Sequence, residues 1–169
     1  PQHMEPNEAL VVLNMVMADA DFEAPTTRKV IAAVPAGKED YAPDPKSMNA
    51  LKLAWHVASA DIWFMNSIAD GKFVPGEPGI PAGITSAADV AAWYDANRPA
   101  AVARLKAMSG EDLAKPLDFM GVFTAPTVTF LTLSLRHIIH HRGQLSAYLR
   151  PMGAKVPGIY GPSGDEPMA

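Results

Sequence analysis

Apolar residues recur every three or four positions in four long segments of this chain, and this spacing constrains its fold more than any other feature. A helix has about 3.6 residues per turn, so such a repeat places its apolar side chains on one face. The segment from Ser47 to Asp70 is the clearest case, and Gly71 is expected to end it. Its predicted buried face comprises Met48, Leu51, Trp55, Ala58, Ile62, Met65 and Ala69.

Three further helices are predicted from the same spacing. The first runs from about Asn7 to Val34 with a kink or break at Pro25, because proline removes a backbone donor and clashes with the preceding turn. Another begins after Ser86, with Asp89 placed for a near capping box, and ends near residue 109. The last runs from about Thr127 to Met152. Its predicted buried face comprises Leu131, Leu135, Ile138, Leu145, Leu149 and Met152.

The stretches between these helices are predicted to be irregular. Residues 71–84 are rich in glycine and proline, and residues 118–121 are typical of a turn or a short extended piece inside an irregular stretch from 111 to 126. Residues 154–169 are expected to lie extended over the bundle. Four helices with connections of moderate length predict an all-α bundle that forms a single domain over residues 1–169.

Composition excludes several classes of function. The net charge is -4, with 14 Lys and Arg against 18 Asp and Glu, and no basic cluster is present to bind nucleic acid. The sequence contains no stretch of about 18 apolar residues, so no membrane span is predicted. The chain has no cysteine, which excludes disulfides, cysteine-ligated zinc and a protein thiol nucleophile. The first residues lack the pattern of a signal peptide, and a cytoplasmic location is expected.

Four of the five histidines fall on two of the predicted helices. His137 and His141 are four residues apart, so they differ by about 40° in direction and their rings can reach one point. His140 is the alternative to His141 as the partner of His137, and it points about 60° to the other side of His137 around the helix axis. Two imidazoles on one helix face supply half of a tetrahedral zinc site. His137 and His141 are preferred because their stripe resembles the lining of a pocket, with Phe130, Ser134, Gln144 and Tyr148.

His56 is the candidate third ligand, on the helix predicted over residues 47–70. It shares the polar side of that helix with Lys52, Ser59 and Trp63. Two interpretations fit this position: a partly exposed surface histidine, or a polar stripe that faces a wet cleft between helices. The residues alone leave both open. Histidine pairs four residues apart also occur by chance, and here Ile138 replaces the glutamate of the H-E-x-x-H metalloprotease motif.

The run from Leu135 to Leu145 resembles the H-x-x-x-H-R-G-Q helix of the DinB-like family. Residues 53–58 resemble the family's second helix, which carries its first histidine ligand, and residues 156–166 resemble the end of many members. The resemblance covers nearly the whole chain. It implies a four-helix bundle with a long crossover, one divalent metal ion on His56, His137 and His141, and a homodimer.

Several neighbours are candidates for a supporting role. Gln144 could orient a ligand or bind a metal-bound water. Alternatively, Gln144 and Tyr148 are ordinary polar residues at one end of the bundle. Gly143 is expected to mark a close approach of helices, because glycine inside a helix costs about 1 kcal/mol relative to alanine. The remaining candidates for the pocket are Trp63, Ser134 and Tyr160, and Trp63 and Tyr160 also fit simple packing.

Three neutral ligands would leave the metal ion its full charge and an open position. Relatives that this chain resembles include transferases that use low-molecular-weight thiols and maleylpyruvate isomerases that depend on them. The resemblance thus implies transfer of such a thiol to a small electrophile through a metal-bound thiolate. A metal-dependent hydrolase that uses bound hydroxide, and a non-enzymatic stress-related binding protein, remain alternatives. Zinc or nickel is the expected ion, although imidazoles also suit iron and copper.

Overall fold

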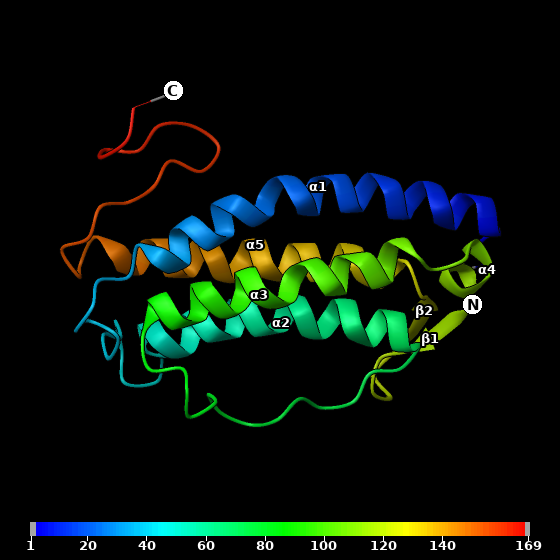
Figure 1. Cartoon of the computed structure of the whole chain (residues 1–169), viewed down its shortest axis with the longest axis horizontal. Helices are drawn as coiled ribbons and strands as arrows, with labels where there is room; N and C mark the ends of the chain where they lie inside the picture. The colour runs from blue at the N-terminus through cyan, green and yellow to red at the C-terminus, as the bar shows by residue number, and fades with distance from the viewer. Residues whose placement is uncertain (1–2, 168–169) are drawn as a thin grey trace.

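The computed structural model describes residues 3–167, and its long helices lie alongside one another in a bundle (Figure 1). This arrangement confirms the all-α fold. The long helices are α1 (Pro6–Ala32), α2 (Ala50–Asp70), α3 (Ala87–Lys106) and α5 (Thr129–Leu149). A short helix and a small hairpin lie between α3 and α5, and comprise α4 (Gly110–Ala114), β1 (Pro116–Asp118) and β2 (Thr124–Pro126).

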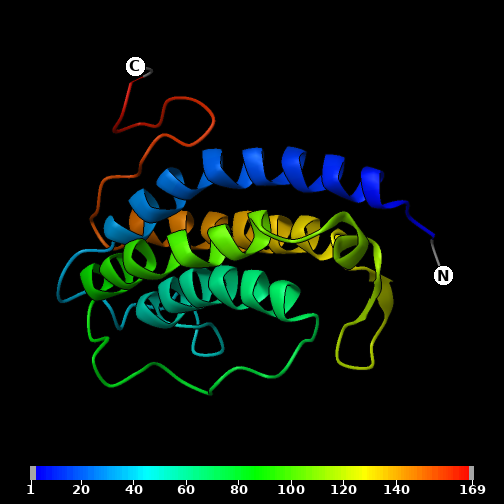
Figure 2. The same ribbon diagram turned by 45° about the vertical axis from the view of Figure 1, so that its right-hand side comes forward.

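The order of the helices around the bundle requires a long crossover. Helix α2 packs between α3 and α5, whereas α1 packs against α3 and α5 on the opposite side of the bundle. Residues 71–86 run back along the outside of the molecule, so α2 and α3 point in the same direction (Figures 1 and 2). Helices α1 and α5 point the other way. The long crossover implied by the family resemblance is therefore present.

Local signals set most helix ends. The Ser86 side chain accepts a hydrogen bond from the Asp89 backbone N–H, and Asp89 caps Ser86 in return, which confirms the predicted capping box. Gly71 ends α2 with a φ of 68°, as predicted. Helix α2 begins three residues later than predicted, because the Asn49 side chain accepts from the Lys52 N–H and forms the cap.

Pro25 does not break α1, which continues to Ala32 and descends towards α5 in its second half (Figure 1). Pro99 likewise lies inside α3. Both prolines line one open groove between α1 and α3, so water can reach the backbone carbonyls that their missing N–H groups leave free. Solvent access therefore explains why neither helix ends at its proline.

The predicted turn at residues 118–121 is present, and it closes an antiparallel hairpin that the sequence did not predict. Met120 and Gly121 have φ values of 51° and 78°, and Asp118 accepts from the Gly121 N–H at 2.7 Å. The short helix α4 was also not predicted. The hairpin matters because it carries Phe119 and Phe123 to the end of the bundle that holds the aromatic residues described below.

The predicted buried face of α5 is largely confirmed, whereas that of α2 is confirmed only in part. Met48 lies before α2 and is 40% exposed, and Leu51 and Trp55 are only half-buried. Ala58, Ile62 and Met65 are buried as predicted. Helix α2 contacts both α3 and α5, so further side chains also enter the core, namely Ala50, Leu53, Ala54, Val57, Phe64 and Ile68. Within the described residues, no helix is long and apolar enough to cross a membrane.

Candidate metal site

Three histidine side chains meet between α2 and α5. His56 comes from α2, and His137 and His141 come from successive turns of α5. One nitrogen from each ring lies within 4.8 Å of the others. The ring centroids are 4.4 Å apart for His56–His141 and His137–His141, and 4.8 Å apart for His56–His137. These three residues could therefore hold one metal ion.

Hydrogen bonding shows which nitrogen of His141 is free. Its Nδ1 lies 2.7 Å from Oε1 of Gln144. An amide oxygen only accepts, so Nδ1–H donates and Nε2 keeps its lone pair. Nε2 of His56 and Nε2 of His137 lie 3.1 Å apart. The Gln144 contact is the kind of supporting bond that fixes a ligating imidazole in one tautomer.

Burial keeps two of the rings neutral. The pKa of His137 is lowered to about 4, mainly by desolvation and to a smaller extent by the charges of His141, His56 and His140. The pKa of His56 is also lowered, mainly by desolvation and to a smaller extent by the charge of His141. A neutral imidazole is the form that binds a metal ion. The donor set thus fits a divalent ion, and Nδ1 of His137 is buried without a hydrogen-bond partner among the described residues.

An aromatic cluster closes one side of the site. The Phe64 ring lies 5.7 Å from the His137 ring. Phe119 of the hairpin packs against Phe64 at 6.2 Å and against Phe130 at 5.8 Å, and Phe73 packs against all three rings. These rings form an apolar wall beside His137. The sequence placed only Phe130 on the stripe of His137 and His141, because Phe64, Phe73 and Phe119 come from three other segments.

Other histidines and Gly143 stay outside the cluster. His140 is exposed, and its ring lies 4.9 Å from that of His141. His3 is exposed and lies near Glu5. Gly143 is exposed, and a Cβ added there would meet nothing within 4 Å. The expectation of a close helix approach at Gly143 was therefore wrong.

The structure separates the predicted supporting residues. Gln144 contacts His141, and Trp63 lines a groove that reaches His56. Tyr148 is farther along α5, where its hydroxyl donates to the Met48 carbonyl at 3.1 Å. Ser134 faces the bundle interior, and Tyr160 bonds to two residues away from the histidines.

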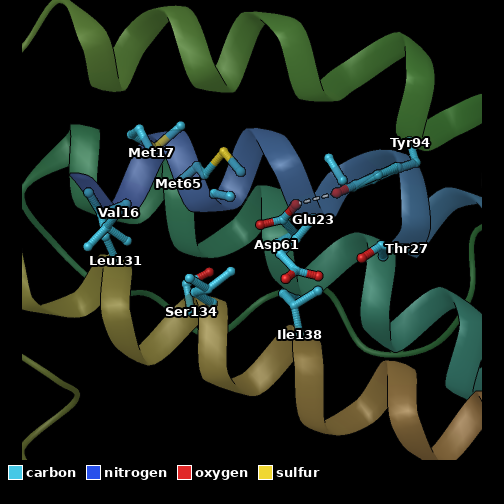
Figure 3. A pocket seen from close by; sticks show the side chains of 13 residues that line it. Val16, Met17, Glu23, Thr27, Asp61, Met65, Tyr94, Leu131, Ser134 and Ile138 are labelled. Carbon is cyan, nitrogen blue, oxygen red and sulfur yellow. Dashed lines mark hydrogen bonds between the residues drawn. The ribbon is translucent and has the colours of Figure 1, made fainter. Parts of the chain in front are cut away.

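Ser134 lines a small interior cavity of about 20 Å³, the size of one water molecule (Figure 3). Asp61 of α2 lies there, and the Tyr94 hydroxyl donates to its Oδ2 at 2.6 Å. Burial raises the pKa of Asp61, although the hydrogen bond from Tyr94 opposes this shift. This carboxyl group is not part of the histidine cluster, so it does not serve as a base at that site.

Comparison with known proteins identifies a family and several relatives. The model of the DinB family matches residues 12–168. Uncharacterized protein YrdA of Bacillus subtilis is 30% identical over 147 residues, which cover 86% of each chain. Uncharacterized protein YjoA of the same organism is 30% identical over 115 residues, 67% of this chain and 73% of YjoA.

Two solved structures share the fold. A DinB-like protein from Bacillus cereus ATCC 10987 has a TM-score of 0.72 and 26% identity, and the match covers 86% of this chain and 95% of that one. The DinB-like protein YjoA from Bacillus subtilis has a TM-score of 0.68 and 23% identity, with 88% and 96% covered. The second match shows the fold alone.

Proposed function

The chain belongs to the DinB family, and from this premise we propose that it is a metal-dependent enzyme that transfers a low-molecular-weight thiol to a small electrophile. One observation carries the proposal: three imidazole nitrogens within 4.8 Å of one another, with no carboxylate in the group. Three ligands are the number typical of catalytic metal sites, where a further position stays open.

Zinc or nickel is the proposed ion, since both accept imidazole ligands. A divalent ion held by His56, His137 and His141 would keep its full charge and would ionise a thiol bound at its open position. The chain contributes the orientation of His141 through Gln144 and the dry aromatic wall beside His137. Both features favour a fixed, water-poor site.

A thiol fits this site better than water does as the nucleophile. The ordinary pKa of a thiol is about 8.5, whereas that of water is about 15.7, so a thiol needs far less help to ionise at neutral pH. The histidine cluster includes no carboxylate that could act as a general base within residues 3–167. In the proposed reaction a carbon–sulfur bond forms, the leaving group departs with its electron pair, and the thiol proton goes to solvent.

The test follows a chromogenic electrophile, 1-chloro-2,4-dinitrobenzene, with cysteine or glutathione as the thiol. Protein purified without a nickel column is first analysed for bound metal. We expect thioether formation and chloride release above the uncatalysed rate, loss of both in His141→Ala, and retention of both in His140→Ala. Metal-dependent hydrolysis of p-nitrophenyl acetate without any thiol transfer would overturn the proposal in favour of a hydrolase.

Assembly and location form part of the same proposal. A homodimer is supported by an apolar stripe on the outer face of α1, where Val11, Met15 and Phe22 are 58%, 66% and 75% exposed. In the C-terminal tail, Glu166 forms its ion pair with Lys29 on α1 of the same chain, so this ion pair does not link two subunits. A cytoplasmic location is supported by the proposed cosubstrate, because small thiols are the reductants of that compartment. Light scattering at micromolar concentration tests the dimer.

A further inference from the structure

All three tryptophans of the chain line one groove on the outer side of α2, and His56 lies at its edge. The groove has a volume of about 380 Å³, which suits a small organic molecule. Trp55 and Trp63 come from α2, and Trp93 comes from α3. Because His56 belongs to both the groove and the histidine cluster, a molecule in the groove would lie next to the candidate metal site.

The crossover segment forms part of the wall of the groove. The indole N–H of Trp63 donates to the Val74 carbonyl at 2.8 Å, which ties residues 71–86 to α2. Gly76 packs against the same ring, and a Cβ at that position would lie 3.8 Å from Trp63 Cδ1. Trp55 and Trp93 pack edge to face with centroids 4.6 Å apart. These contacts fix the aromatic walls relative to one another.

In the metal-free chain, the lining of the groove carries one negative charge. Glu77, on the crossover, is the charged side chain of its lining, and its carboxylate forms no ion pair within residues 3–167. Asn66 also lines the groove, and its Oδ1 accepts from Arg104 at 2.8 Å. Arg104 is itself paired with Asp70, so its charge is compensated.

We propose that this groove binds an organic ammonium group, with the tryptophan rings around the cation and Glu77 as its counter-ion. Indole faces attract cations more strongly than other side-chain rings do, and a carboxylate adds a direct charge attraction. The ammonium group would belong to a substrate or cosubstrate of the histidine site. This last link rests on the proposed function, whereas binding of the cation does not.

The probe is choline, compared with 3,3-dimethyl-1-butanol, a neutral molecule of nearly the same shape. Both are titrated into the metal-free full-length chain, and the three tryptophan indole N–H signals are followed by NMR. We expect all three signals to shift with choline, at an affinity at least about threefold higher than for the neutral analogue. Equal affinity for the two probes, or no shift with choline, would overturn the proposal.

Two variants locate the binding. Glu77→Gln should weaken choline binding about threefold to tenfold and leave binding of the neutral analogue unchanged. Glu111→Gln, in an exposed position on α4, is the matched control and should bind choline as the parent chain does. An unchanged choline affinity in Glu77→Gln would contradict the assignment. Metal content measured separately distinguishes failure of this groove from failure of the histidine site.

Discussion

Arg142, which directly follows His141 on α5, donates a hydrogen bond to the carboxylate of Glu23 on α1. The Arg142 side chain is 1% exposed. It also donates to Thr27 Oγ1 at 3.2 Å and to the Tyr160 hydroxyl at 2.8 Å. Tyr160 in turn donates to Glu23 Oε1 at 2.8 Å. One arginine thus joins α5, α1 and the C-terminal tail.

The first prediction concerns this pair. Replacing Arg142 with Met leaves the partly buried Glu23 carboxylate without its charge partner, so the free energy of unfolding should fall by about 3 kcal/mol, the lower end of the range for a buried pair. Urea denaturation followed by circular dichroism measures the loss. Tyr160→Phe removes one hydroxyl from the same network and should cost only about 1 kcal/mol. Equal losses in the two variants would show that the charge pair is not the stabilising element.

The second prediction concerns the ligands. His137→Ala and His141→Ala should abolish stoichiometric metal binding, and His56→Ala should weaken it strongly, because each removes one of three converging nitrogens. His140→Ala is the control on the same helix and should bind nearly as the parent chain does. Elemental analysis of protein loaded with zinc and then dialysed provides the measurement. Loss of metal in His140→Ala but not in His141→Ala would refute the assignment on α5.

The third prediction concerns Gln144. Its Oε1 holds Nδ1–H of His141, and loss of such a supporting bond weakens metal affinity by about 10–100-fold. Gln144→Ala should show a drop of this size in competition with a chromophoric chelator. Gln144→Glu keeps an acceptor oxygen in place and should restore most of the affinity. Equal affinity in Gln144→Ala and the parent chain would mean that the contact does not orient the ligand.

The fourth prediction is a pH dependence of opposite sign at two carboxyl groups. Burial raises the pKa of Asp61 in the folded chain, so this group favours folding at low pH and loses that contribution as pH rises from about 4 through its folded pKa. Asp61→Asn should therefore gain stability relative to the parent chain over that range. Urea denaturation between pH 4 and 8 measures the difference.

Asp165 is the matched control. Hydrogen bonds from the Val156 N–H and from Arg150 hold its pKa below the ordinary value. Its contribution to stability is present above the unfolded pKa and is lost as pH falls through the folded pKa. Asp165→Asn should therefore lose stability relative to the parent chain as pH rises towards about 4, and the difference should stay constant above that pH. The same slope in both variants would refute the assignment of the two environments.

Local chemistry explains why the helix ends could be predicted from the sequence. The Ser86–Asp89 box and the left-handed Gly71 depend on residues within one turn, and both were predicted. The buried face of α2 was predicted only in part, because it depends on which two helices flank α2. Asp61 illustrates the consequence, since a charged residue occupies a core position beside Tyr94.

The candidate site shows the same division. The spacing of His137 and His141 predicts that they share a face, because both lie on one helix. The position of His56 depends on the register between α2 and α5, so the residues alone could not decide between its two interpretations. Ser134 and Tyr160 were grouped with the site by the helical wheel and by resemblance. The structure places one in the interior cavity and the other beside Arg142.

The last prediction is that the bundle folds without its metal ion. Its core is built from apolar side chains of all four long helices, each worth about 1.5–3 kcal/mol when fully buried. A zinc finger lacks such a core and unfolds without metal. Metal would still stabilise the folded chain by about 2.7 kcal/mol at one hundred times its dissociation constant. A chelator should therefore leave the helical circular dichroism largely intact, lower the melting temperature moderately and remove any thiol transfer. Loss of the helices at room temperature would instead make the ion structural, and the case for an open, reactive site would lose its physical basis.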